Sequence, residues 1–138
     1  MKQVLGMAAG AAFLMMPMTA FAASMTASDF ASARLAAFGS GDFKALMEQY
    51  SDDAIVLTQQ GTLTGKSQIG PMIEAALAEF GQAGTKFNLI STLAEGNVVT
   101  FVWSGETAKN TYHHVAETYV LQDGKARYET FAAQISPK

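Results

Sequence analysis

The chain has 138 residues, a formal net charge of −3 and no cysteine. Nucleic acids and anionic membrane surfaces are bound through basic patches, so this acidic balance argues against both as partners. A chain without cysteine has neither disulfide bonds nor thiolate metal ligands, and its stability must come from a hydrophobic core, for which one domain of this length is large enough.

The first 22 residues have the pattern of a secretory signal peptide. Lys2 precedes an apolar stretch over residues 4–18, and Ala20 and Ala22 then form an A-x-A pattern. The apolar stretch is shorter than the roughly 20 residues that a bilayer requires, so we expect cleavage rather than anchoring. The sequence therefore predicts export to the periplasm or the medium, no membrane contact after cleavage, and a single mature domain over residues 23–138.

Two helices are predicted at the start of the mature domain. Apolar residues recur at helical spacing over residues 28–38, and Ser28 is the expected N-cap. A Gly-Ser-Gly segment at residues 39–41 should end this helix. Asp42 is the expected cap of a short second helix that runs through Tyr50.

A strand and a third helix should follow. The aliphatic run at residues 54–58 favours a strand, and we expect Asp52 and Asp53 to hydrogen-bond the backbone of the turn before it rather than to act as a catalytic pair. A third helix is predicted from residue 66 or 67 to Phe80, because its apolar side chains repeat at i, i+3, i+4 and i+7.

The remainder of the chain is predicted to be strands. Segments rich in Val, Ile, Thr, Phe and Tyr cover residues 85–93, 97–106, 111–122 and 125–136, and Asp123-Gly124 between the last two is a strong hairpin signal. Helices first and strands last predict an α+β fold in which three helices cover one face of a curved antiparallel sheet.

Two motifs carry a resemblance to a known family. They are AAFGSGDFKALMEQYSDDAIVL at residues 36–57 and GTLTGKSQIGPMI at residues 61–73. These motifs, together with the order of the predicted helices and strands, resemble the SnoaL-like and ketosteroid-isomerase-like group of the nuclear transport factor 2 superfamily. The resemblance implies a cone-shaped half barrel, an apolar pocket for a small hydrophobic molecule, and a homodimer through the outer sheet face. The group contains isomerases, cyclases and hydrolases as well as noncatalytic binding modules, so it leaves open whether this chain is an enzyme.

The steroid isomerases of this group imply three catalytic positions. They use an aspartate base at the end of the first strand, a tyrosine on the first helix and a second acid on a later strand. In this chain the corresponding residues are Thr58, Arg34 and Glu117. A threonine cannot take a proton from carbon, so isomerisation of steroids by that mechanism is not expected.

Glu117 is the main candidate for acid–base chemistry. Strand alternation places His113, Glu117 and Tyr119 on one face, and a carboxyl group on the pocket wall could act as a general acid or base, with His113 beside it. Arg34 would then tune the acid. The candidate substrate-binding residues are Arg34, Thr58, Trp103 and Tyr119. The alternative is a solvent-facing Glu117 in a noncatalytic ligand-binding or dimeric module.

Neither a metal nor a cofactor is expected. His113 and His114 are adjacent in a strand and point to opposite faces, so they cannot share one ion without a bulge. The segment at residues 61–70 contains Gly-Lys-Ser but lacks the spacing of a phosphate-binding loop, which argues against a nucleotide.

Overall fold

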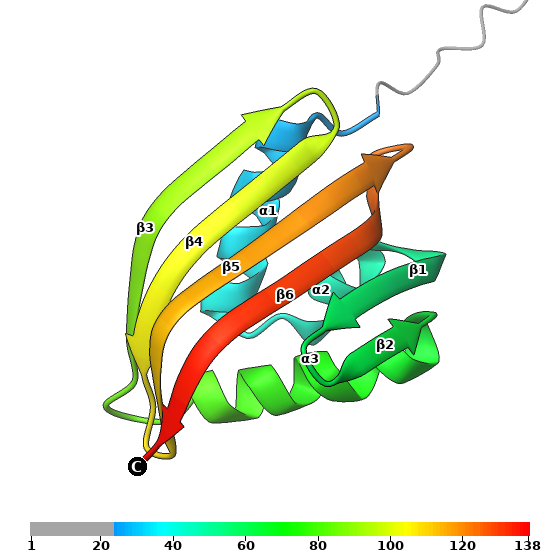
Figure 1. The fold of residues 1–138 in the computed structure, drawn as a ribbon. Helices are drawn as coiled ribbons and strands as arrows, with labels where there is room; N and C mark the ends of the chain where they lie inside the picture. The colour runs from blue at the N-terminus through cyan, green and yellow to red at the C-terminus, as the bar shows by residue number, and fades with distance from the viewer. Residues whose placement is uncertain (1–23) are drawn as a thin grey trace, which may run out of the picture.

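A computed structural model describes residues 24–138 of the chain (Figure 1). The expected signal peptide, residues 1–22, lies outside the described residues. The described part is α+β, as predicted. Its elements are α1 (Ala27–Ser40), α2 (Phe43–Glu48), β1 (Tyr50–Thr58), β2 (Gly61–Thr64), α3 (Lys66–Phe80), β3 (Lys86–Glu95), β4 (Val98–Glu106), β5 (Asn110–Gln122) and β6 (Lys125–Pro137).

Capping side chains explain where the first two helices begin. Thr26 Oγ1 accepts a hydrogen bond from the backbone N–H of Asp29 at 3.1 Å, and the Asp29 carboxylate accepts one from the backbone N–H of Thr26 in return. The prediction of Ser28 as the N-cap is therefore wrong, because this reciprocal pair begins the helix two residues earlier. Asp42 caps α2 as predicted, accepting from the backbone N–H of Ala45 at 2.9 Å.

The strands form one curved sheet in the order β2-β1-β6-β5-β4-β3 (Figure 1). Neighbouring strands are antiparallel except β1 and β6, which pair in parallel, so the predicted antiparallel sheet holds for every neighbouring pair but one. Asp123 and Gly124 make the predicted tight turn between β5 and β6, with positive φ angles of 52° and 75°. The last strand in the chain thus lies inside the sheet, between β1 and β5.

The three helices pack on one face of the sheet, as predicted (Figure 1). The core between the two layers is apolar and rich in aromatic rings. Its largest fully buried side chains are Tyr50, Tyr119, Phe30, Leu46, Ile69, Val56, Val99 and Val115.

The opposite, outer face of the sheet carries uncharged side chains at its centre. They form three rows across β4, β5 and β6, set by the register of the strands. The rows are Val98–Val120–Tyr128, Thr100–Thr118–Thr130 and Val102–Ala116–Ala132. None of the helices in residues 24–138 lies over this face (Figure 1).

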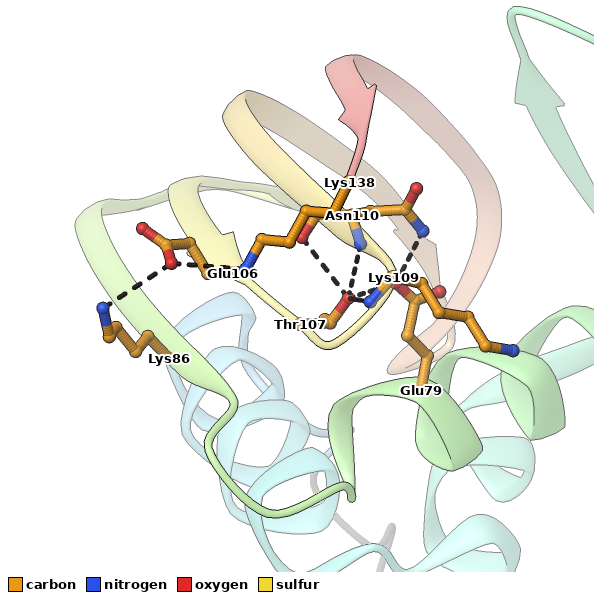
Figure 2. Close-up of polar contacts among 7 residues, drawn as sticks. All are labelled: Glu79, Lys86, Glu106, Thr107, Lys109, Asn110 and Lys138. Carbon is orange, nitrogen blue, oxygen red and sulfur yellow. Dashed lines mark hydrogen bonds and ion pairs between the residues drawn. The ribbon is translucent and has the colours of Figure 1, made fainter.

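A polar cluster ties the turn between β4 and β5 to the end of α3 (Figure 2). The hydroxyl of Thr107 donates to Glu79 Oε1 at 2.7 Å, and Asn110 Nδ2 donates to the same oxygen at 2.8 Å. This contact fixes the C-terminal end of α3, where the ring of Phe80 packs edge-on against Trp103 with centroids 5.5 Å apart. Figure 2 also shows Glu106 beside Lys86 and Lys138.

Candidate functional site

A cavity of about 160 Å³ lies between the helix layer and the sheet. One water molecule needs roughly 10–15 Å³ of such space, so the cavity is large enough for a small organic molecule. Most of its wall is apolar, and four polar side chains stand out among the lining residues. The cavity is lined by Arg34, Leu35, Phe38, Met72, Ile73, Ala76, Phe87, Phe101, Trp103, Glu117, Tyr119, Glu129 and Phe131.

Arg34, on α1, is buried at the polar end of this cavity. Its Nη2 donates to the hydroxyl of Tyr50 at 2.8 Å. Its guanidinium carbon lies 4.9 Å from the ring centre of Tyr50 and 5.0 Å from that of Tyr119, a geometry that gives a cation–π attraction to each ring. Burial opposes the charged form, but the two tyrosines and the carboxyl groups of Glu129 and Glu117 raise the pKa of Arg34, so the guanidinium stays charged.

Glu129, on β6, is a buried carboxyl group that the sequence reasoning missed. It is 3% exposed, and the Tyr50 hydroxyl that accepts from Arg34 donates to its Oε2. Burial raises the pKa of Glu129 to about 7; Arg34 opposes this shift, whereas the neighbouring Glu117 adds to it. A carboxyl group with this pKa can hold or release a proton near neutral pH.

Glu117, on β5, is held by two donors. Trp103 Nε1 donates to its Oε1 at 3.0 Å, and the hydroxyl of Tyr119 donates to its Oε2 at 2.8 Å. Burial raises the pKa of Tyr119 well above its ordinary value, so the phenol remains a hydrogen-bond donor. Both oxygens of Glu117 are thereby oriented at the cavity wall. Four of the residues singled out from the sequence, Arg34, Trp103, Glu117 and Tyr119, thus line one cavity.

His113 lies outside the cavity, so the prediction that it shares the pocket face with Glu117 is wrong. The pairing of β5 with β6 shifts by one residue between Tyr112 and His114, which is a β-bulge. The bulge turns Tyr112 toward the core and leaves His113 exposed, with its Nε2 2.9 Å from Ser136 Oγ.

Thr58 also lies apart from the lining residues, contrary to its prediction as a substrate-binding residue. Its Oγ1 accepts hydrogen bonds from the backbone N–H groups of Gln60 and Gly61, each at 3.2 Å. The hydroxyl therefore stabilises the turn between β1 and β2.

Asp52 and Asp53 make ion pairs on the surface. Asp52 Oδ1 lies 3.0 Å from Lys66 Nζ, and Asp53 Oδ2 lies 3.3 Å from Arg127 Nη2. Because β1 begins at Tyr50, earlier than predicted, both aspartates lie in the strand rather than in a turn before it. Neither lines the cavity, and their expected hydrogen bonds to a turn backbone are replaced by these side-chain pairs.

Residues 24–138 lack two further features. In that range no three His, Cys, Asp or Glu side chains are grouped so that they could hold a metal ion. No helix of the described chain combines the length and the apolar character needed to span a membrane.

Solved structures of several proteins resemble this fold. A protein from Kribbella flavida DSM 17836 has a TM-score of 0.68 at 17% identity, covering 79% of this chain and 87% of that one. A candidate ketosteroid isomerase from the same organism has a TM-score of 0.63 at 10% identity, covering 76% and 75%. A candidate polyketide cyclase from Sinorhizobium meliloti has a TM-score of 0.60 at 16% identity, covering 75% and 93%. At these identities the likeness shows the fold alone.

The family is shown by the sequence itself. None of the curated proteins compared with the chain matches it. The family model described as a SnoaL-like domain matches residues 31–129, which is most of the chain. The resemblance and the nuclear transport factor 2-like fold predicted from the sequence motifs are therefore confirmed. This chain belongs to the SnoaL-like domain family.

Proposed function

We propose that the protein binds a small, mostly apolar molecule in the cavity and acts on one of its polar groups by acid–base chemistry. The supporting observation is that two carboxyl groups, Glu117 and Glu129, lie at the polar end of an otherwise apolar cavity. The raised pKa of Glu129, about 7, suits general acid–base catalysis near neutral pH. The names of two structural relatives, a candidate ketosteroid isomerase and a candidate polyketide cyclase, support this class of reaction.

In this proposal the two carboxyl groups have complementary roles. Glu117, whose oxygens are oriented by Trp103 and Tyr119, takes a proton from the bound molecule. Glu129, protonated in part near pH 7, returns one at another position. Two such transfers leave the number of protons on the molecule unchanged, as an isomerisation requires, and proton exchange with water then returns Glu117 and Glu129 to their starting states. Arg34 acts as a positioning residue, since it reaches Glu129 through the hydroxyl of Tyr50.

A noncatalytic ligand-binding module is the second candidate. It is favoured by the completeness of the polar cluster, in which Glu117 accepts from Trp103 and Tyr119 while Glu129 accepts from Tyr50. Buried polar groups that satisfy one another stabilise a fold without taking part in a reaction.

A ligand screen with matched variants tests the proposal. Thermal shift would be measured with steroids, aromatic polyketide-like compounds and fatty acids, on the wild type, Glu117→Gln and Asp53→Asn. We expect a stabilising ligand whose effect is lost or reduced in Glu117→Gln and kept in Asp53→Asn, because Glu117 lines the cavity and Asp53 does not. The opposite pattern would contradict the proposal.

Turnover separates the two candidates. With the ligand from the screen, the acid–base proposal predicts conversion that Glu117→Gln slows by about a hundredfold or more. Conversion would be followed by chromatography of the ligand. Binding without conversion in the wild type would leave the noncatalytic module as the function.

The outer sheet face supports a homodimer as part of this proposal. Its three rows are uncharged, and beside them Leu93 on β3 is 66% exposed. An uncharged face with two apolar rows is usually covered by another surface, and a second copy of the chain offers the same face.

Export completes the proposed function. It is supported by the charge, the apolar stretch and the A-x-A pattern of residues 1–22. N-terminal sequencing of the protein recovered from the periplasm or the medium would test it, and we expect a first residue near position 23.

A further inference from the structure

The strand β3 leaves one edge of the sheet open. It is the last strand in the sheet order, and no strand of residues 24–138 pairs with its outer side (Figure 1). Proteins commonly protect a sheet edge by keeping its strand short or by placing charges or proline in it. At the opposite edge, β2 has only four residues and follows this rule, whereas β3 has ten.

The composition of β3 favours pairing with a further strand. Residues 87–94 contain no charged residue, no proline and no glycine. Four large apolar side chains of this segment are between 38% and 66% exposed, namely Phe87, Leu89, Ile90 and Leu93. A long, uncharged edge strand offers free backbone N–H and C=O groups beside apolar side chains, which is the surface that an added strand covers.

A β-bulge sets the register in which β3 can pair with a copy of itself. The pairing of β3 with β4 shifts between Leu89 and Ser91, so Ile90 is the extra residue. Without Ile90, the strand has nine positions, and Ser91 is the central one. In an antiparallel pair related by a two-fold axis, the central residue lies opposite the same residue of the other copy. An axis at Ser91 therefore places Lys86 of each copy opposite Glu95 of the other.

This register also matches the two faces of the sheet. Positions of β3 opposite Val98, Thr100 and Val102 lie on the outer face, and the alternate positions lie on the helix side. Each outer residue of one copy then lies opposite an outer residue of the other. The outer residues are Lys86, Asn88, Ser91, Leu93 and Glu95, and those on the helix side are Phe87, Leu89, Thr92 and Ala94.

The charges at the two ends of β3 are complementary in the antiparallel orientation. Among residues 24–138, Glu95 has no salt-bridge partner. Lys86 shares the carboxylate of Glu106 with Lys138, at 3.5 and 3.4 Å, so Lys86 can pair with a second carboxylate while Lys138 still neutralises Glu106. A parallel orientation would instead place like charges opposite each other, which is destabilising. The charges thus indicate a second copy of the chain as the partner of this edge.

We propose that β3 pairs antiparallel with β3 of a second copy, about a two-fold axis at Ser91, so that two six-stranded sheets join into one. This contact uses the edge of the sheet, whereas the homodimer proposed above uses its outer face. The inference therefore does not rest on the proposed function.

Single cysteines test the register, because the chain has none of its own. Residues opposite each other in an antiparallel pair have Cα atoms about 4.5–5.5 Å apart, a distance that a disulfide bond spans. We expect Ser91→Cys to form a linked dimer under mild oxidation. Leu93→Cys should not, since the two copies of Leu93 would lie roughly 13 Å apart along the strands. Thr62→Cys, on the exposed β2 edge, measures random collision.

Non-reducing electrophoresis would give the linked fraction, and circular dichroism would check that each variant is folded. Linkage of Ser91→Cys above the level of Thr62→Cys, without linkage of Leu93→Cys, would support the proposed register. Linkage of Leu93→Cys alone would indicate contact through the outer sheet face and contradict the strand pairing. If neither exceeds Thr62→Cys, a second copy is the wrong partner for this edge.

A charge exchange tests the two ends of the contact. Glu95→Lys turns two attractive cross-strand pairs into repulsive ones, so it should raise the dissociation constant about tenfold. Adding Lys86→Glu exchanges the charges and should restore the affinity. Glu74→Lys, the same charge change on an exposed position of α3, should have no effect.

Sedimentation velocity would measure these variants in the Thr130→Arg background, where a charge on the outer face opposes the other proposed contact. A Glu95→Lys protein that dimerises as well as its background would overturn the proposal, and so would a double variant that stays as weak as Glu95→Lys. None of these measurements involves a ligand, so the proposed acid–base site is tested separately.

Discussion

Among the individual residues, Glu129 is a carboxyl group whose ionisation is linked to folding. Its ordinary pKa is 4.5, and burial in the folded protein raises it to about 7. Between these values the folded protein binds more protons than the unfolded chain, so the free energy of unfolding must fall as pH rises. The stabilisation is fully present below pH 4.5 and is lost as pH rises through 7.

We expect this residue to lower the free energy of unfolding by up to about 3 kcal/mol between pH 4.5 and 7, since one pKa unit corresponds to about 1.4 kcal/mol. Urea unfolding at pH 5 and pH 7 would measure the fall. Glu129→Gln should remove most of it, because the amide is neutral at both values. The exposed Glu74→Gln is the matched control and should keep it. An equal fall in Glu129→Gln and wild type would show that Glu129 is not its source.

Among the elements, α1 is stabilised at its N-terminus by a capping box, and it positions Arg34 in the site. Thr26→Ala removes the hydroxyl that accepts from the backbone of Asp29, and it should lower the free energy of unfolding by about 1 kcal/mol. Ser28→Ala, at the position that the sequence pattern favoured, should cost less than half as much. Chemical denaturation of both variants gives the comparison, and equal losses would argue against Thr26 as the cap.

Elements defined by local signals could be predicted from the sequence. The third helix follows from the spacing of its apolar residues, the start of α2 from Asp42, and the last hairpin from Asp123-Gly124. The parallel pairing of β1 with β6 could not be predicted in this way. It joins Tyr50 to Ala126 and depends on contacts between distant parts of the chain.

Two β-bulges explain which site residues could be assigned to the correct face of the sheet from the sequence. Between Val115 and Val120 strand β5 pairs regularly with both neighbours, so alternation gave the correct face for Glu117 and Tyr119. The bulge beside His113 breaks that alternation. A second shift in the pairing of β5 with β6, at Arg127, turns Glu129 toward the cavity. Regular alternation of residues from the hairpin onward would have placed Glu129 on the outer face of the sheet. A bulge is set by packing across the sheet and leaves little trace in the sequence.

For the whole molecule, the outer sheet face makes the association state testable. Thr130→Arg adds a charge to the central threonine row, and burying it in an interface without a partner should raise the dissociation constant of the proposed homodimer about tenfold or more. Ser32→Arg adds the same charge on α1, on the helix side of the sheet, and should have no effect. Sedimentation velocity would measure the masses. A wild-type protein that sediments as a monomer would contradict the dimer.

The interior position of β6 also sets the order in which the molecule can fold. Because β6 lies between β1 and β5, the β1–β2 hairpin cannot join the strands β3, β4 and β5 in one sheet until residues 125–137 have arrived. Contacts between segments so far apart in sequence form slowly, since a long loop must close before they stabilise the chain. A chain that leaves the ribosome with its N-terminus first would thus complete its sheet only when nearly all of it has emerged.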